Sequence, residues 1–324
     1  MSSRRSFRIG TRRSALAQWQ AQWVAEKLRS LGADVQLVLM VTEGDRRQEL
    51  LADAWTTRGI FTRELQKALL DGQIDLAVHS LKDLPTQPVE GLLLAAVPER
   101  GPVGDVLIAR NHCPLGQLPS GAIIGTGSLR RQAQMLHARP DLQMAPLRGN
   151  VDTRLRKLQA GQYDAIVLAE AGLSRLGIPE SAWTERLFPG VLLPAIGQGA
   201  LGIEVRADDA EAVGWVQRVD HPASHAAVVA ERVMLSHLQG GCLAPVAAWA
   251  RVEHHELLLT GRVLDPTGQQ MVEVTQTAPI AQWLPDTGPA GTDLLETAAA
   301  LGRQVAEELL AQGAGPLIQA ARQQ

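Results

Sequence analysis

Two side chains in this sequence are placed for covalent and proton-transfer chemistry, and the first is a cysteine. Cys242 lies in the stretch LSHLQGGCLAPVA, after Gly240 and Gly241 and before Pro245. Glycine leaves the backbone sterically open and proline cannot continue a helix, so the thiol is expected on a loop after a helix over 221–238. A lone loop cysteine is more often a bystander than a reactive group, so other residues must decide its role.

The second is Asp83, in the stretch DLAVHSLKDLPT. It follows Lys82 just past the end of an expected strand, and Pro85 fixes the direction in which the chain leaves. An aspartate among many cations stays ionised, so it can act as counter-ion to a positive intermediate or relay a proton. The alternative is a turn aspartate without chemical role. His79, on the strand itself, is expected to be packed and not catalytic.

Basic and hydroxyl side chains follow several other expected strands. They are Arg12 and Ser14 in GTRRS, Thr126, Ser128, Arg130 and Arg131 in GTGSLRR, Arg148 and Arg154 in LRGNVDTR, and Arg175 in AGLSRLG. Ligands of α/β sheets bind beyond the carboxyl ends of strands, at helix N-termini. Arginine forks bind carboxylates bidentately, so the set predicts a ligand with many carboxylates. The alternative is that each arginine is solvated or pairs with a nearby acid.

Other classes of function are disfavoured. The net charge of −3 gives no general attraction to nucleic acid or anionic membrane, and no phosphate-loop or dinucleotide-binding pattern is present. The two cysteines show no zinc spacing, and their scarcity fits a reducing cytosol. No run of residues approaches the roughly 20 apolar residues that span a membrane. The sequence therefore predicts a cytoplasmic protein without a metal site.

Strands and helices alternate over the first two hundred residues, which predicts two α/β lobes with doubly wound sheets. The stretch VQLVLMV, residues 35–41, is expected to be a strand buried on both faces. The last third changes to alternating strands with turns at 254–256 and 265–268, then a closing helix over 293–315. This predicts a small α+β domain with an antiparallel sheet.

Seven long motifs, in order, closely resemble hydroxymethylbilane synthase, also called porphobilinogen deaminase. They are RIGTRRSALAQWQA, GIFTRELQKALLDGQIDLAVHSLKDLPT, GTGSLRRQAQ, LRGNVDTRLRKL, YDAIVLAEAGLSRLG, LPAIGQGALGIE and ERVMLSHLQGGCLAPV. The resemblance runs from about residue 8 to the C-terminus and weakens after about 255. It implies a three-domain fold whose first two domains look like a type II periplasmic binding protein, with the active site between them. The implied division is 1–98 with 196–217, then 99–195, then 218–324.

The resemblance also implies a transferase of tetrapyrrole (porphyrin and heme) biosynthesis. Such an enzyme joins four porphobilinogens head to tail, each losing ammonia, and hydrolysis releases hydroxymethylbilane. Its dipyrromethane cofactor, built from its own substrate, would be attached to Cys242 through a thioether, and Asp83 would be catalytic. The implied cofactor contacts are Lys82, Asp83, Thr126, Ser128, Arg130, Arg131 and Arg154. The implied substrate contacts are Arg12, Ser14, Arg148, Arg154, Arg175 and Gln198. The family suggests a monomer with porphobilinogen as partner and no nucleic acid or membrane.

Some positions depart from the family pattern. The segment DAWTTRGIF keeps only Arg58 where the family usually has lysines, and the hinge PERGPVGDV keeps Asp105.

Two rival functions remain: a two-lobed protein that binds a carboxylate or oxyanion without catalysis, and a cysteine-nucleophile hydrolase. The hydrolase would need a base for the thiol, and His237 is the only histidine near Cys242 in sequence. Neither rival accounts for Asp83, the arginines and Cys242 together.

Overall fold

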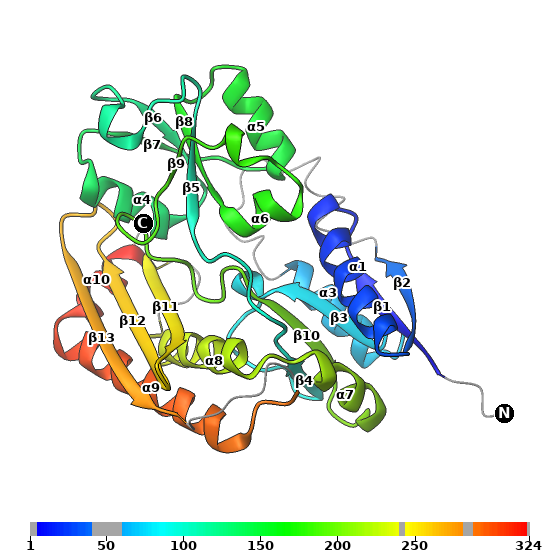
Figure 1. Ribbon diagram of the computed structural model, residues 1–324. Helices are drawn as coiled ribbons and strands as arrows, with labels where there is room; N and C mark the ends of the chain where they lie inside the picture. Colours follow the sequence, from blue (N-terminus) through cyan, green and yellow to red (C-terminus); the bar gives the residue numbers. More distant parts are fainter. Residues whose placement is uncertain (1–4, 41–59, 240–243, 281–287, 323–324) are drawn as a thin grey trace. The chain divides into compact units, whose positions relative to one another are not determined.

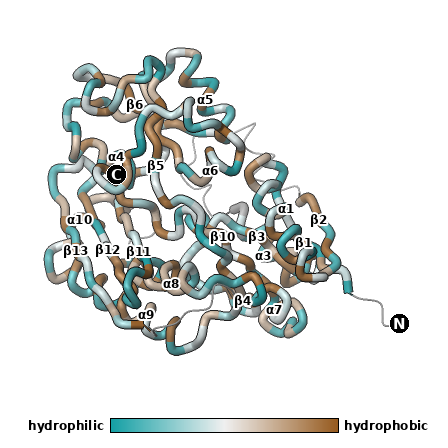
Figure 2. Tube along the Cα trace, viewed as in Figure 1, coloured by the Kyte–Doolittle hydropathy of each residue, from teal (hydrophilic) through white to brown (hydrophobic). Residues whose placement is uncertain are grey.

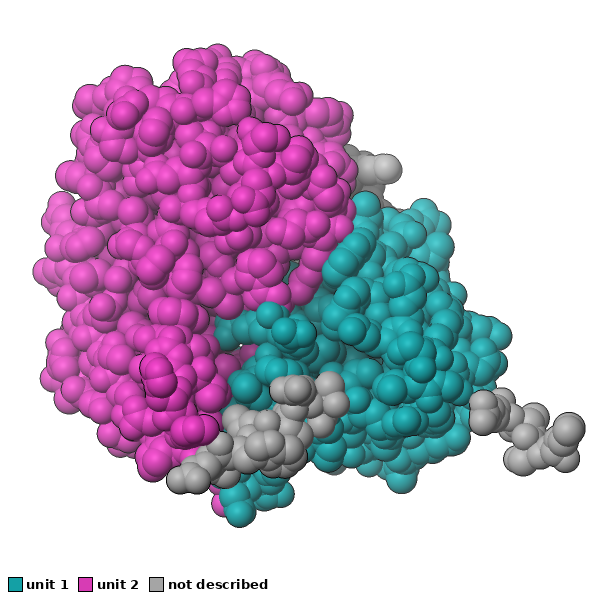
Figure 3. Space-filling view, viewed as in Figure 1, with its two compact units in different colours: residues 1–100, 200–226, 281–295 teal, residues 101–199, 227–280, 296–324 magenta. Residues whose placement is uncertain are grey.

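The computed structural model describes residues 5–40, 60–239, 244–280 and 288–322 (Figure 1). The chain divides into two compact units, which Figure 3 colours separately. They comprise residues 1–100, 200–226 and 281–295, and residues 101–199, 227–280 and 296–324. The second unit holds two of the three sheets of the described residues, and the division into three domains stays a prediction.

The first sheet is mixed, with the strand order β2-β1-β3-β10-β4. Its strands are β1 (Ser6–Thr11), β2 (Asp34–Leu39), β3 (Leu76–Ser80), β4 (Leu92–Ala96) and β10 (Leu201–Arg206). β1 is parallel to β2 and β3, whereas β10 is antiparallel to β3 and β4. The helices of this unit's α/β segment are α1 (Ala15–Ser30), α3 (Ile60–Leu70) and α7 (Ala210–Val216). Apolar side chains of β1, β3, β10, α1 and α7 share one core.

β2 is an edge strand, and the prediction that its apolar run is buried on both faces is wrong. Val35 is 3% exposed, whereas Leu39 is 56% exposed. Within the described residues β2 pairs with β1 on one side alone, and so it has less cover than a central strand receives. A run of apolar residues indicates a strand but not its position in the sheet, which tertiary packing sets.

Both ends of helix α1 carry residues that are typical of helix termini. Ser14 caps its N-terminus, where the hydroxyl oxygen accepts a hydrogen bond from Ala17 N at 3.3 Å. Gly32 follows the C-cap with a φ of +95°, a conformation that glycine adopts without steric cost. These two residues mark the ends of the helix that begins three residues after Arg12.

The second sheet, also mixed, has the order β7-β6-β8-β5-β9. Its strands are β5 (Asp105–Ala109), β6 (Ile123–Gly125), β7 (Gln143–Ala145), β8 (Ala165–Ala169) and β9 (Glu185–Arg186). β6 is parallel to β7 and β8, and β5 is antiparallel to β8 and β9. Helices α4 (Leu129–Ala138), α5 (Val151–Gln159) and α6 (Glu170–Arg175) complete this segment. All five residues of β5 are buried, and Figure 2 shows the hydrophobic colour along this strand.

The third sheet is antiparallel, as predicted, and contains β11 (Val246–Glu253), β12 (Glu256–Leu264) and β13 (Met271–Pro279). The first hairpin turns at His254 and His255, whose φ values of 49° and 65° suit a two-residue turn. The accompanying helices are α8 (Pro222–His237), α9 (Thr292–Ala311) and α10 (Ala314–Arg322). Two α/β sheets followed by a small antiparallel sheet confirm the predicted fold class.

Helices long and apolar enough to cross a membrane are absent from the described part of the chain.

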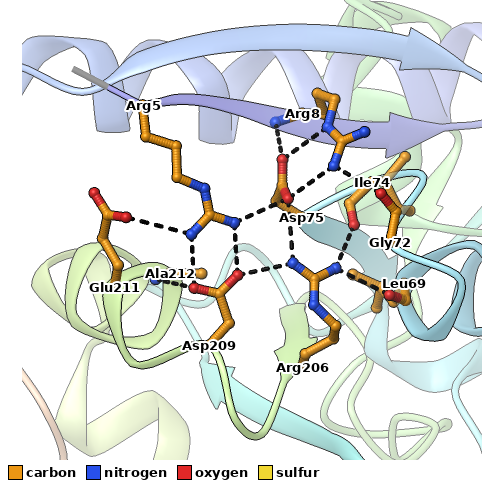
Figure 4. Close-up of polar contacts among 10 residues, drawn as sticks. All are labelled: Arg5, Arg8, Leu69, Gly72, Ile74, Asp75, Arg206, Asp209, Glu211 and Ala212. Atoms are coloured by element: carbon orange, nitrogen blue, oxygen red, sulfur yellow. Dashed lines mark hydrogen bonds and ion pairs between the residues drawn. The ribbon is translucent and has the colours of Figure 1, made fainter. Parts of the chain in front are cut away.

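A cluster of arginines and carboxylates ties β1 to later parts of the first unit (Figure 4). Its centre is Asp75, whose side chain is 3% exposed and receives hydrogen bonds from three guanidinium groups, those of Arg5, Arg8 and Arg206. Asp209 accepts from Arg5 at 2.6 Å and from Arg206 at 2.8 Å. Burial alone would raise the pKa of Asp75, but the arginines outweigh it and hold this pKa well below its ordinary value.

The variant Asp75→Asn is expected to lower the free energy of unfolding at pH 7 by about 1–3 kcal/mol, because three guanidinium groups lose their buried, charged acceptor. Since the folded-state pKa is depressed, this contribution is complete above the unfolded pKa of about 4 and fades as the pH falls towards the folded value. Urea titrations at pH 7 and pH 3 measure it. Asp34→Asn, at an exposed position on β2, is the control. A deficit equal at both pH values would contradict the prediction.

Candidate active site

Lys82 and Asp83 lie on a single turn of 3-10 helix, Leu81–Asp83, that directly follows β3. Leu81 and Leu84 are 1% and 6% exposed, and Leu84 N donates to Leu81 O at 3.2 Å. Leu81 N also donates to Ala200 O at the start of β10. Two buried leucines therefore hold the turn, while the side chains of Lys82 and Asp83 are exposed between them. Asp83 is in a position to meet a ligand from solvent.

Two sets of polar contacts, one at Ser80 and one at His79, hold the end of β3 that precedes this turn. Ser80 and Gln20 exchange hydrogen bonds of 2.8 and 3.1 Å between β3 and α1. His79 is buried, as predicted, with its Nε2 2.9 Å from Glu204 Oε2 on β10. Gln66 on α3 donates to the same carboxylate at 3.1 and 3.2 Å. Sequence reasoning did not find Glu204 or Gln66, because their pairing depends on strand order.

The segment from Gly125 to Ser128 leads from β6 into α4. Thr126 is 4% exposed and its hydroxyl accepts from Ser128 N at 3.2 Å. Ser128 is the N-cap residue of α4 but its side chain makes no capping hydrogen bond. A Cβ at Gly127 would lie 2.8 Å from Leu147 O. Glycine is required there because another part of the chain's own backbone approaches closely.

Arg130 and Arg131 share one buried carboxylate, that of Asp105 at the start of β5. Arg130 Nη2 lies 2.7 Å from Asp105 Oδ2, and Arg131 Nη2 lies 2.7 Å from Oδ1. The three side chains are 0–7% exposed. Burial would raise the pKa of Asp105, but the two guanidinium charges outweigh it and hold this pKa well below its ordinary value. These two arginines therefore pair with an acid, which was the alternative to ligand binding. Their contact with a cofactor stays a prediction.

Gln198 joins the same group. Its amide nitrogen donates to Asp105 Oδ1 at 3.0 Å and to the carbonyls of Val103 and Gly104 at 2.8 and 3.1 Å. The predicted hinge segment itself is thus held by Gln198, which the family resemblance assigned to substrate. That assignment stays a prediction, while the role of Asp105 as the shared acceptor was missed.

The variant Asp105→Asn is expected to lower the free energy of unfolding by about 3–5 kcal/mol at pH 7, because it leaves two buried guanidinium charges without their counter-ion. Guanidinium chloride titration measures the change. Asp141→Asn is the control, since Asp141 pairs with Arg139 at the surface and should cost much less. A loss no larger than that of the control would show that the pair of arginines does not depend on Asp105.

Arg148 and Arg154 flank the start of α5 and are half-buried. Asn150 caps this helix by accepting from Thr153 N at 3.0 Å, and Arg154 Nε donates to Gly149 O at 2.8 Å. Lys157 Nζ donates to Arg148 O at 3.3 Å. The structure therefore brings these two predicted arginines together at one helix N-terminus, where anions are favoured.

Arg175, at the end of α6, donates from Nη2 to Gly199 O at 2.6 Å. Burial lowers the pKa of Arg175 to about 10, so the side chain keeps its charge at neutral pH. Gly199 has a φ of +84°, and a Cβ there would lie 2.5 Å from Gly101 O. The partly buried charge of Arg175 is thus bound by a carbonyl oxygen of Gly199, a position where the close backbone and the positive φ require glycine.

Arg12 and Ser14 follow β1 in the first unit, and Arg12 is half-buried. The hydroxyl of Ser14 accepts the α1 capping bond and can donate at the same time.

Cys242 lies outside the described residues, as do Arg58 and Gly240. The described chain before Cys242 is α8 with Leu238, which is 4% exposed.

Comparisons with known proteins agree with the motifs. The family model "Porphobilinogen deaminase, dipyromethane cofactor binding domain" matches residues 7–214, and "Porphobilinogen deaminase, C-terminal domain" matches 225–311. A porphobilinogen deaminase of Pelotomaculum thermopropionicum is 45% identical over 323 residues, 99% of this chain and 98% of its own. That of Desulforudis audaxviator is 46% identical over 317 residues, 97% of each chain.

Among solved structures, a putative methionine-binding lipoprotein of Bacillus subtilis aligns with 67% of this chain and 91% of its own, at 14% identity and a TM-score of 0.41. The fold assignment rests on the strand order given above and not on this distant likeness. The two family models cover most of the chain and the relatives nearly all of it, which confirms the resemblance. The chain belongs to the porphobilinogen deaminase family.

Proposed function

We propose that this chain is a hydroxymethylbilane synthase, a transferase that condenses four porphobilinogen molecules head to tail and releases one ammonia at each step. The observation that carries the proposal is the match of both family domains together with 45% identity over 99% of the chain. The exposed Asp83 on a rigid turn and the arginines at helix starts supply the side-chain chemistry that this reaction needs.

The residues present fit a dipyrromethane cofactor. Each porphobilinogen carries an acetate and a propionate, so two condensed units bring four carboxylates. Arg154 is half-buried in the first turn of α5, where a helix N-terminus favours a bound carboxylate. We assign the thioether to Cys242 and the carboxylate contacts to Lys82, Arg130, Arg131 and Arg154, with Thr126 and Ser128 as hydrogen-bond donors. When bound, the cofactor supplies the pyrrole terminus that the first substrate extends.

We assign the chemical step to Asp83. A carbon–carbon bond forms at the substrate's aminomethyl carbon as its carbon–nitrogen bond breaks, and the amino group, which is protonated in the bound substrate, departs as neutral ammonia. Positive charge develops on the pyrrole nitrogen, and the Asp83 carboxylate stabilises it. Asp83 also accepts the proton lost from the ring carbon that forms the bond. Arg12, Ser14, Arg148, Arg154, Arg175 and Gln198 would bind and orient the substrate carboxylates.

Turnover of porphobilinogen by the purified chain tests the proposal. We expect four ammonia molecules for each linear tetrapyrrole that forms. A two-lobed binding protein without catalysis would instead bind porphobilinogen reversibly and release no ammonia, and that result would reject the synthase. We also propose a monomer in the cytoplasm, which sedimentation of the pure protein and fractionation of its cells would check.

A further inference from the structure

A line of hydrogen bonds runs from the antiparallel sheet into helix α4. Arg262 on β12 is opposite Glu273 on β13, and its Nε donates to Glu273 Oε2 at 2.5 Å. Arg262 Nη1 donates to Gln134 Oε1 at 2.9 Å. Gln134 lies on α4, one turn after Arg130, and is 1% exposed. An ion pair between the central strand β12 and its neighbour β13 is therefore linked to a fully buried amide.

Gln134 holds the peptide groups of Leu193 from both sides. Leu193 N donates to Gln134 Oε1 at 2.9 Å, and Gln134 Nε2 donates to Leu193 O at 3.2 Å. Arg130 Nη1 donates to the same carbonyl oxygen. Because Arg130 Nη2 is held by Asp105, two fixed acceptors determine the plane of this guanidinium group. Gln134 supports one of the two.

A second contact joins the sheet to α4. Gly268, in the turn between β12 and β13, has a φ of +75°, and a Cβ there would lie 2.4 Å from Ala133 O and 2.6 Å from His137 N. Gly268 O is 2.8 Å from His137 Nδ1. The hairpin backbone thus rests directly on the helix backbone, which keeps Arg262 in reach of Gln134.

We propose that Arg262 and Gln134 are positioning residues for Arg130, so that the antiparallel sheet sets the orientation of a carboxylate-binding guanidinium. The inference rests on the proposed function, which gives Arg130 its ligand. A guanidinium is a rigid planar fork, so bidentate binding of a carboxylate depends on the direction of that plane. Neither Arg262 nor Gln134 needs to touch the ligand. Arg262 holds the Gln134 side chain, and Gln134 holds the Leu193 carbonyl that accepts from Arg130.

The test is the uptake of cofactor by the full-length protein purified from cells that make no porphobilinogen. Intact mass after addition of limiting porphobilinogen follows the gain of two condensed units. Arg262→Leu is expected to slow this gain about tenfold, the effect of losing one hydrogen bond to a charged group. Glu273→Gln, at a more exposed position, should slow it in the same direction by a smaller factor and keeps the test valid if Arg262→Leu folds poorly.

Arg251→Leu is the matched control. Arg251 lies on β11 of the same sheet, donates to Glu253 at 2.7 Å and stacks 3.8 Å from the Trp249 ring centre. It should leave uptake within about twofold of the wild type, because its partners Glu253 and Trp249 lie on its own strand, β11. In an Arg130→Lys background, Arg262→Leu should no longer change the rate of uptake. It should still shift the Tm, because the ion pair with Glu273 is lost in either background. Equal slowing of uptake by Arg262→Leu and Arg251→Leu would overturn the proposal. A tenfold slowing by Arg262→Leu in the Arg130→Lys background would also overturn it.

A wild type that gains no mass would reject the proposed function and not this network. Hydrogen exchange of the Leu193 amide then decides, since that amide donates to Gln134. It should exchange faster in Arg262→Leu than in Arg251→Leu or the wild type. Unchanged exchange would show that Arg262 does not fix Leu193, and the proposal would fall.

Discussion

Asp83→Asn is expected to lower kcat by about 10²–10⁴-fold while KM changes little, because the amide neither stabilises a developing cation nor accepts a proton. The side chain is exposed on a turn held by two buried leucines, so Tm should stay near that of the wild type. Steady-state rates of ammonia release, with thermal unfolding in parallel, measure both quantities.

Asp71→Asn is the matched control, since Asp71 is an exposed aspartate of the same unit, just after α3. It should retain the wild-type kcat. An Asp83→Asn enzyme within about threefold of the wild type would show that the carboxylate is a turn residue, the alternative that its sequence context allowed.

Cys242→Ser is expected to abolish the covalent adduct and, with it, formation of hydroxymethylbilane. Serine is nearly the same size, but its hydroxyl is a far weaker nucleophile than a thiolate. The intact mass of the wild type should exceed that of the polypeptide by two condensed porphobilinogen units, and the variant should show the polypeptide mass alone.

Cys113→Ser controls for loss of a thiol in general. Cys113 is half-buried against the core of the second α/β segment, and its replacement should leave the adduct intact. If the wild type shows no extra mass after incubation with porphobilinogen, the thioether assignment is wrong. An adduct that persists in Cys242→Ser but disappears in Cys113→Ser would move the anchor to the other cysteine.

The order of strands and helices was predictable because each element carries a local signal. The cap at Ser14 and the turn glycine at Gly32 set the ends of α1 within the sequence itself. β2 shows the limit of such signals, since its apolar run does not reveal that it lies at a sheet edge. Burial on both faces is a property of the sheet and not of the strand.

In the candidate site, too, the sequence predicted the positions of single residues but not their partners. The sequence alone placed Asp83 past a strand and Arg130 at a helix start, because strand ends and helix starts are local features. The partners of these residues were not predictable: Asp105 meets Arg130 only because β5 and α4 become neighbours in three dimensions. Arg262 and Gln134 lie still farther apart, and their bond depends on where the hairpin at Gly268 rests.

The place of β10 in the first sheet has a consequence for synthesis of the protein. β10 lies between β3 and β4, yet the ribosome makes it only after all strands of the second sheet. The second sheet, from β5 to β9, is complete in one continuous segment and can form while the N-terminal strands still wait. Until Leu201 emerges, β3 and β4 present open edges that can pair with other chains. We therefore expect a nascent chain stalled before β10 to aggregate more readily than the complete chain.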